Sequence, residues 1–295
     1  MFSMASAFPP VYTQAITVGQ GLAGVTVALA GLFTTLAGSD DQSCISDDWG
    51  TLVYFAVAEV LLLGCLVAYP VLRRLPVTRY YTRAIDNNDI MSAFVDDVVN
   101  NGDIDANDNS IGCDCYHMEL RSKLAPISPY LFSILFAFII TLSVFPGVTS
   151  LIASSRECQA GRSRFFASDV FVMFSFVSFN TFDLLGRLAA GLPIALPFRW
   201  LPVASISRFV FVPLFLGCRS ACSRFPYHWL WADAFPLSIM PVFGFTNGYV
   251  LSLSMMAGSQ KGEWASLAMS LFLSGGLLTG SLLSFLVLYA GTTDC

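Results

Sequence analysis

Long apolar segments separated by short polar ones run along the entire chain. The apolar runs recur at a length of about 20 residues, which is the length of helix needed to cross a hydrocarbon core. They are continuously apolar rather than alternating at every second position, which argues against a β-barrel. The pattern predicts an all-α protein, a polytopic transmembrane helical bundle. The seven expected spans are residues 19–38, 49–72, 129–153, 167–191, 201–218, 229–257 and 264–290, preceded by an apolar stub at 2–17 that Pro9 and Pro10 interrupt.

A long polar stretch divides the chain into three parts. Residues 1–73 hold the stub and two spans, residues 74–125 form the polar stretch, and residues 126–295 hold the other five spans. The middle part is rich in Asp and Asn and poor in large apolar residues, so we expect a disordered loop. Arg and Lys near helix ends mark the cytoplasmic side. The loop after the second span carries six such residues and the loop before it none, which predicts a cytoplasmic loop 74–125 and an extracytosolic C-terminus.

Composition supports the membrane assignment and excludes other classes. Of the 295 residues, 55% are hydrophobic and only 12% are charged, against about a quarter charged in soluble domains. The net charge of −5 comes from acidic loops, and no basic patch is interleaved with aromatic residues, so we expect no nucleic-acid partner. The sequence C-x-C-x-H at Cys113, Cys115 and His117 supplies three ligands where a structural zinc site needs four, so we expect no metal. Cys44, Cys158, Cys218 and Cys222 are expected outside the cytosol, where a disulfide can form, and their pairing stays open.

The fourth span contains two opposite charges, within FNTFDLLGR at residues 179–187. On a helix, Asn180, Asp183 and Arg187 share one face, and the two charges are four residues apart, within pairing reach. Charged side chains near the bilayer centre cost about 2.5–3.5 kcal/mol each on insertion scales, so they should face the bundle interior or a watery cavity. We favour a substrate-binding stripe, and a purely structural ion pair is the alternative.

Small residues at helical spacing predict close helix packing. GQGLAG at 19–24 matches the dinucleotide fingerprint G-x-G-x-x-G, but it lies in an apolar span rather than between a strand and a helix, so we expect no cofactor. Gly19, Gly24 and Gly31 are expected in helix packing or along a pathway. Gly244 and Gly248 in the sixth span, and Gly276 and Gly280 in the seventh, are expected to form similar seams.

Four further features of the spans carry expectations. Pro236 and Pro241 predict a broken sixth span, because such breaks are tolerated where freed backbone groups meet neighbours or line a cavity. Asn247 and Tyr249 lie just beyond these prolines. For both residues, interhelical hydrogen bonding and a role in gating or substrate contact are equal alternatives. Arg208 is expected to extend from a helix end to the membrane interface, and the role of Glu59 is open. The two histidines, His117 and His228, form no set with a nucleophile and an acid, so we expect no enzyme.

Several motifs, in order, resemble the equilibrative nucleoside transporter family. FPPVYTQAITVGQGLAG looks like the junction of that family's fourth and fifth helices, and FNTFDLLGR looks like its eighth helix. The long polar stretch falls where the family has its large cytoplasmic loop. Further resemblances are FPGVTSLI to the seventh helix, RWLPVASISRFVFVPLFLGC to the ninth, FTNGYVLSLSM to the tenth and SLFLSGGLLTGSLLSF to the eleventh.

The resemblance implies a major-facilitator-like bundle and facilitated nucleoside transport by alternating access, with nucleobases as further substrates. The family's eighth-helix acid and base fall on Asp183 and Arg187, which would contact the ribose hydroxyls, with Asn180 supporting them. A full member has eleven helices, so we expect a chain that lacks the first three. The alternative function is a non-transporting membrane fragment that associates with full-length relatives.

The expected partners are a nucleoside and the lipid bilayer. The plasma membrane is favoured over an intracellular membrane. The oligomeric state, the base preference and the coupling to protons stay open.

Overall fold

The computed structural model describes residues 9–37, 48–76, 78, 124–156, 163–193, 196–218 and 233–291. Most of the polar stretch 74–125 lies outside this part of the chain, so its expected disorder is not tested. The same holds for the apolar positions 2–8 and for a set of Cys and His residues on which expectations were placed. These are Cys44, Cys113, Cys115, His117, Cys158, Cys222 and His228.

Seven helical segments of the described chain are long and apolar enough to cross a membrane, which confirms the expected transmembrane bundle. Four of the long helices lie close to their expected bounds, and two shorter helices share one span. Two 3₁₀ turns, η3 (Phe198–Trp200) and η4 (Arg208–Val210), belong to that divided span. The α-helices are α2 (Pro10–Ala37), α3 (Asp48–Arg74), α7 (Ser128–Val144), α8 (Ser168–Ala189), α9 (Leu201–Ser207), α10 (Phe211–Leu216), α11 (Ala234–Ser259) and α12 (Glu263–Gly291).

Three expectations about the spans were wrong. Helix α2 begins at Pro10, so positions 10–17 of the expected stub belong to the first span. Proline is tolerated there because the first helical residue needs no N–H partner. The α-helix of the third span, expected at 129–153, ends at Val144 and is followed by a turn and the 3₁₀ turn η1 (Thr149–Leu151). The sixth span is a continuous helix, α11, with Pro241 inside it, whereas a 3₁₀ turn, η4, divides the fifth span between α9 and α10.

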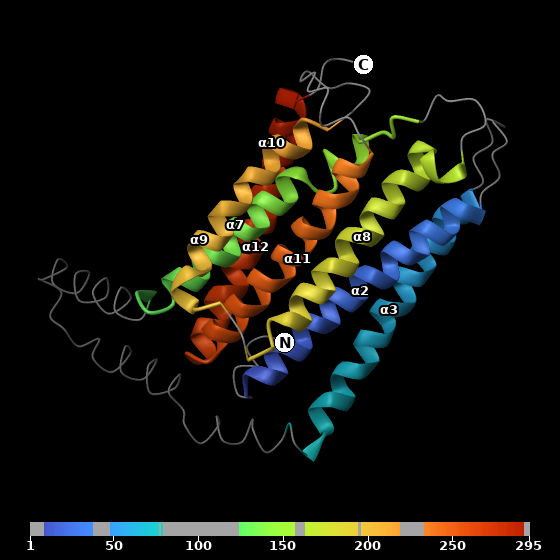
Figure 1. Ribbon diagram of the computed structural model, residues 1–295. Helices are drawn as coiled ribbons and strands as arrows, with labels where there is room; N and C mark the ends of the chain where they lie inside the picture. The colour runs from blue at the N-terminus through green and yellow to red at the C-terminus, as the bar shows by residue number, and fades with distance from the viewer. Residues whose placement is uncertain are drawn as a thin grey trace, which may run out of the picture.

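Helix α11 is central in the packing, because it contacts α2, α7, α8, α9 and α12. Helix α8 packs most extensively against α11, α7 against α12, and α2 against α8, while α3 lies at the outer edge beside α2 (Figure 1). The C-terminal ends of α3 and α12 lie at opposite ends of the bundle, as the expected topology requires. Which end faces the cytosol stays a prediction.

Glycines allow the closest helix pairs to touch through their backbones. A Cβ atom at Gly244 or Gly248 of α11 would collide with the carbonyl oxygens of Phe179 and Asp183 in α8. A Cβ at Gly186 of α8 would collide in turn with the Phe245 carbonyl oxygen of α11. The expected seam in the sixth span is therefore confirmed, and both helices contribute glycines to it.

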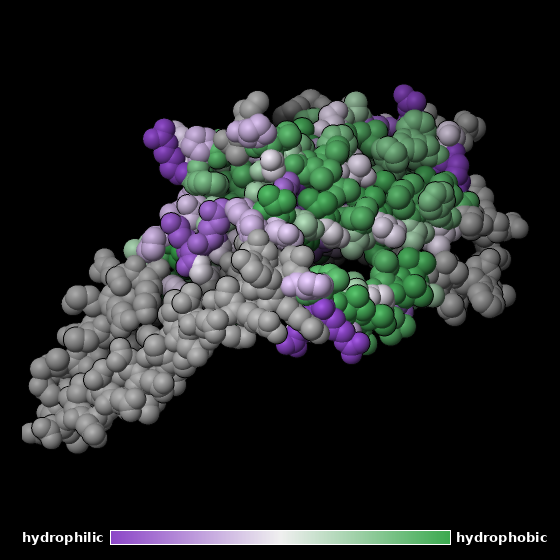
Figure 2. Space-filling view, turned by 90° about the horizontal axis from the view of Figure 1, so that it is seen from below, coloured by the Kyte–Doolittle hydropathy of each residue, from purple (hydrophilic) through white to green (hydrophobic). Residues whose placement is uncertain are grey.

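The outer surface suits a lipid environment. Hydrophobic residues cover a broad continuous area, and hydrophilic residues gather toward its edges (Figure 2). Helix α3 has none of its span buried within the described structure, and side chains such as Phe55, Leu62 and Leu66 are largely exposed. The interior, in contrast, holds a cluster of buried phenylalanines that includes Phe171, Phe215 and Phe243.

The glycine seam between α7 and α12 generates the first prediction. A Cβ at Gly276 would lie 2.9 Å from the Leu135 carbonyl oxygen, and one at Gly280 would lie 2.8 Å from that of Phe138. We expect Gly276→Ala and Gly280→Ala each to destabilise the protein by about 1–3 kcal/mol, the usual range for overpacking. Thermal unfolding in detergent measures the change.

Gly275 provides the matched control for this seam. A Cβ there would meet only a Leu135 methyl carbon, at 3.9 Å. Gly275→Ala should leave the unfolding temperature unchanged or raise it. Equal unfolding temperatures for all three variants would show that the seam does not depend on its glycines.

Candidate functional site

The centre of the candidate site is an ion pair within α8. The Nε atom of Arg187 donates to Oδ2 of Asp183 at 2.6 Å, and the two residues are four apart on the helix. Only 5% of Asp183 and 8% of Arg187 is exposed. This burial confirms the expectation that the two charges face the bundle interior. On the outer surface, both charges would face hydrocarbon.

The second carboxylate oxygen of Asp183 is bound by the neighbouring helix. Asn247 of α11 donates from Nδ2 to Oδ1 of Asp183 at 2.6 Å. Its own Oδ1 accepts from the Thr141 hydroxyl of α7 at 2.8 Å. Asn247 therefore makes the expected interhelical hydrogen bonds, and its contact with a substrate stays a prediction. Gly248 next to it lets the α11 backbone approach Asp183.

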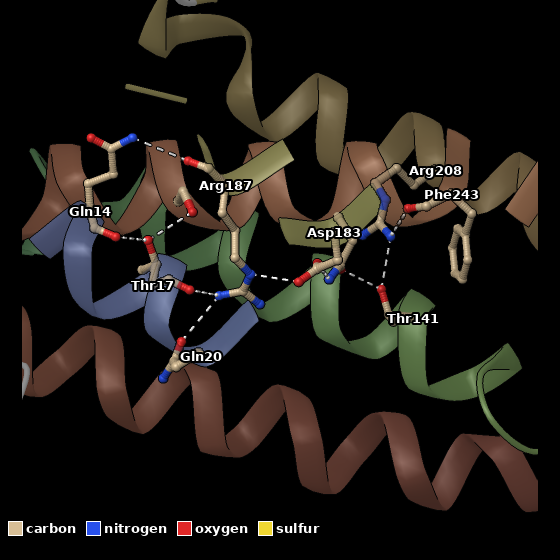
Figure 3. A network of polar contacts seen from close by, with 10 residues as sticks. Gln14, Thr17, Gln20, Thr141, Asp183, Arg187, Arg208 and Phe243 are labelled. Atoms are coloured by element: carbon tan, nitrogen blue, oxygen red, sulfur yellow. Dashed lines mark hydrogen bonds and ion pairs between the residues drawn. The ribbon is translucent and has the colours of Figure 1, made fainter. Parts of the chain in front are cut away.

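Arg187 also ties α8 to α2. Its Nη1 donates to the Thr17 carbonyl oxygen at 3.0 Å and to Oε1 of Gln20 at 3.2 Å. Ser252 of α11 donates to the Thr17 hydroxyl at 3.0 Å. These contacts join three helices around one guanidinium group (Figure 3). The Nη2 atom of Arg187 makes no hydrogen bond within the described residues, so two N–H donors remain there.

Arg208 contradicts the expectation that it extends to the membrane interface. The residue is 2% exposed and lies at the break between α9 and α10. Its guanidinium donates to the carbonyl oxygens of Ala137 and Phe243 and to the hydroxyls of Thr141 and Thr246, at 2.9–3.3 Å. It also lies 5.0 Å from the centre of the Phe243 ring. An unpaired cation in a membrane span commonly extends to the interface, but four acceptors from α7 and α11 satisfy this one inside the bundle.

Asn180, the third residue of the predicted stripe, lies beside the ion pair rather than in it. Asn180 donates to the Phe176 carbonyl oxygen of its own helix at 2.9 Å, and it makes no hydrogen bond to Asp183 or Arg187. Gly24 of α2 lies directly against the Asn180 side chain. Gly19 is exposed, and nothing in the described structure lies within 4 Å of an added Cβ, so it supports no close packing there. Gly21 takes that role instead, since its Cβ would lie 2.9 Å from the Arg187 side chain.

Two further polar residues have distinct positions. Tyr249 accepts a hydrogen bond from the Leu196 backbone N–H at 2.9 Å, and thereby holds the segment before α9 against α11. Glu59 is exposed on the apolar helix α3, and no hydrogen bond or ion pair involves it in the part of the chain that the structure covers. Its role stays open.

No metal or cofactor site was expected, and two observations on the described residues bear on this point. Among the residues the structure describes, no group of three potential ligands gathers. GQGLAG lies inside the long helix α2, so it lacks the strand-to-helix turn that a dinucleotide site needs. Cys218 is a free, buried thiol, and the other three cysteines for which a disulfide was considered lie outside the described residues.

Sequence reasoning missed most of the residues that surround the ion pair. Thr17, Gln20, Thr141 and Ser252 were not singled out, because small polar side chains in apolar spans are common and carry little signal. Arg208 was noticed but placed wrongly. Its charge within an apolar segment is the signal that points to an interior role.

Fold and site together define a polytopic helical membrane protein with a buried polar cluster between its spans. The sequence comparison then gives the family: the nucleoside transporter family matches residues 1–289, and the chain belongs to it. The chain is 30% identical to equilibrative nucleoside transporter 1 of Homo sapiens, over 97% of this chain and 64% of the relative. It is 28% identical to equilibrative nucleoside transporter 2 of Rattus norvegicus, over 97% and 67%. It is 23% identical to equilibrative nucleotide transporter 1 of Arabidopsis thaliana, over 97% and 58%.

Removing one partner of the buried pair should be strongly destabilising. Arg187→Met leaves Asp183 as an uncompensated buried charge, and such losses cost about 3–5 kcal/mol. We expect the double variant Asp183→Asn with Arg187→Met to be more stable than Arg187→Met alone, because the isolated charge is gone. Unfolding in detergent and denaturant measures both, together with the single variant Asp183→Asn. Strictly additive effects of the two substitutions would contradict a coupled pair.

Proposed function

We propose that this chain carries the sugar-binding part of a facilitative nucleoside carrier. In this proposal Asp183 and Arg187 hold the ribose hydroxyls, and Asn180 lines the same space. The carrier works by alternating access and resides in the plasma membrane, with transport rather than catalysis as its activity. Purine or pyrimidine preference and coupling to protons are left open.

The unused hydrogen-bonding capacity of the ion pair is the observation that carries the proposal. Arg187 keeps the two N–H donors of Nη2 unengaged within the described chain, after Nε and Nη1 have bound protein acceptors. A carboxylate offers about four acceptor sites, and Asp183 uses two, for Arg187 and Asn247. A vicinal diol both donates and accepts, so it complements a carboxylate beside a guanidinium.

Energetics favour a functional role over a purely structural one. A buried ion pair is weak evidence for stability, because its desolvation can exceed the attraction between its charges. Each charge also makes insertion of its helix less favourable. A pair of apolar residues would join α8 to α11 and α2 without these costs. The names of the relatives, which are equilibrative nucleoside transporters, support the same reading.

Nucleoside uptake tests the proposal. Proteoliposomes are prepared with the 295-residue chain, and with the same chain fused to the part of the human relative that it does not match. We expect uptake of uridine or adenosine above that of empty liposomes in at least one preparation. Asp183→Ala and Arg187→Ala should each lower it about 10- to 100-fold, since hydrogen bonds to charged groups contribute about 1.5–3 kcal/mol.

The exposed ion pair at the start of α8 supplies matched controls. Arg164 and Asp169 are joined at 3.0 Å, with 31% and 48% of their side chains exposed. Arg164→Ala and Asp169→Ala should leave uptake near the wild-type level. Wild-type uptake in the Asp183 and Arg187 variants would refute their assignment to the substrate site, and no uptake in either preparation would refute the carrier function.

A second candidate function is association with a full-length relative without transport by this chain. The exposed α3 favours it, since this helix packs on α2 and carries Glu59 on an otherwise apolar surface. A carboxylate in a membrane span needs a partner that donates hydrogen bonds, and a neighbouring transmembrane helix can supply one.

Co-expression with the human relative distinguishes the two functions. If association is the function, the tagged chain should co-purify with the relative and change its uptake of uridine, and Glu59→Leu should weaken the association. Cys65→Leu on the same exposed helix is the control. This candidate would be eliminated if the two proteins did not co-purify and the uptake of uridine by the relative were unchanged.

A further inference from the structure

A chain of hydrogen bonds leads from the buried Arg208 to the carboxylate of Asp183. Arg208 donates from Nη2 to the Thr141 hydroxyl at 2.9 Å. Thr141 lies 2.8 Å from Oδ1 of Asn247, and Asn247 donates to Asp183 at 2.6 Å. Figure 3 shows Arg208, Thr141 and Asp183 around this chain, which crosses from η4 through α7 and α11 to α8.

The donors and acceptors allow only one direction along this chain. A carboxylate paired with Arg187 can only accept, so Asn247 must turn its amide N–H toward Asp183 and its carbonyl oxygen toward Thr141. An arginine can only donate, so Thr141 accepts from Arg208. The single hydroxyl hydrogen of Thr141 then has Oδ1 of Asn247 within reach, at 2.8 Å.

A competing acceptor shows why Arg208 matters for this direction. The Thr141 hydroxyl also lies 2.7 Å from the Ala137 carbonyl oxygen, one turn earlier on α7. Arg208 donates from Nη1 to that same carbonyl at 3.1 Å. The carbonyl thus has a donor of its own, and the Thr141 hydrogen is available for Asn247.

We propose that Arg208 is a positioning residue that, acting through Thr141 and Asn247, fixes the orientation of the Asp183 carboxylate toward the sugar. The inference rests on the proposed function and adds residues to it. Arg187 holds one oxygen of the carboxylate and Asn247 the other, so the plane of the group is set from both sides. The remaining lone pairs then point in fixed directions for the ribose hydroxyls.

The consequence is specific to the sugar. Recognition of hydroxyl groups depends on the direction of the carboxylate lone pairs, whereas contacts with the base do not. Loss of the chain should therefore reduce the preference for uridine over 2′,3′-dideoxyuridine, which has the same base and lacks both hydroxyls.

The test measures that preference in the uptake preparations described above. Competition by uridine and by 2′,3′-dideoxyuridine against labelled uridine gives the ratio of their apparent affinities. Thr141→Val keeps the shape of the side chain and removes the hydroxyl, and we expect the ratio to fall at least fivefold. Thr141→Ser, which keeps the hydroxyl, should leave the ratio at the wild-type value. Arg208→Lys should also lower it, and it provides a second variant if Thr141→Val does not fold.

Thr246→Val is the matched control. Thr246 accepts from Nε of Arg208 at 3.3 Å and lies outside the chain to Asp183. A structural role alone predicts that Thr141→Val and Thr246→Val reduce uptake of the nucleoside without changing the ratio, and this result would overturn the inference. Absence of wild-type uptake, or a wild-type ratio in Asp183→Ala, would instead overturn the proposed function.

Discussion

The burial of charge inside an apolar bundle is the constraint on which the rest of the structure depends. Asp183 and Arg187 lie within a span that hydrocarbon would otherwise surround, so neighbouring helices must supply hydrogen-bonding partners for them. Helix α2 supplies the Thr17 carbonyl and Gln20, and α11 supplies Asn247. The second buried cation, Arg208, is satisfied in the same way by carbonyls and hydroxyls of α7 and α11.

Close helix packing makes these short polar contacts geometrically available. Gly244 and Gly248 bring the α11 backbone against α8, and Gly186 does the same from the other side. With larger residues there, Asn247 would lie too far from Asp183 for a bond of 2.6 Å. Glycine seams and polar contacts are thus one arrangement: the first sets the distance between helices, and the second depends on that distance.

Local patterns predicted some elements well and others badly. Seven apolar runs predicted seven spans, because length and hydropathy are properties of one segment at a time. The shared face of Asp183 and Arg187 followed from helical periodicity alone. Pro236 and Pro241 suggested a break in α11 that does not occur, while a 3₁₀ turn at Arg208–Val210 divides the fifth span just before Pro213. The burial of Arg208, by contrast, depends on acceptors from two other helices, which no single segment reveals.

The sequence by itself determined the membrane class, the number of spans, the family and the residues of the buried ion pair. Each of these follows from composition, periodicity or motifs that lie close together in the chain. Only the tertiary structure decided that Arg208 is buried, that Thr141 and Asn247 connect it to Asp183, and that Gly21 rather than Gly19 approaches Arg187. These contacts join residues far apart in the chain, and their formation depends on distances between helices that side-chain packing sets.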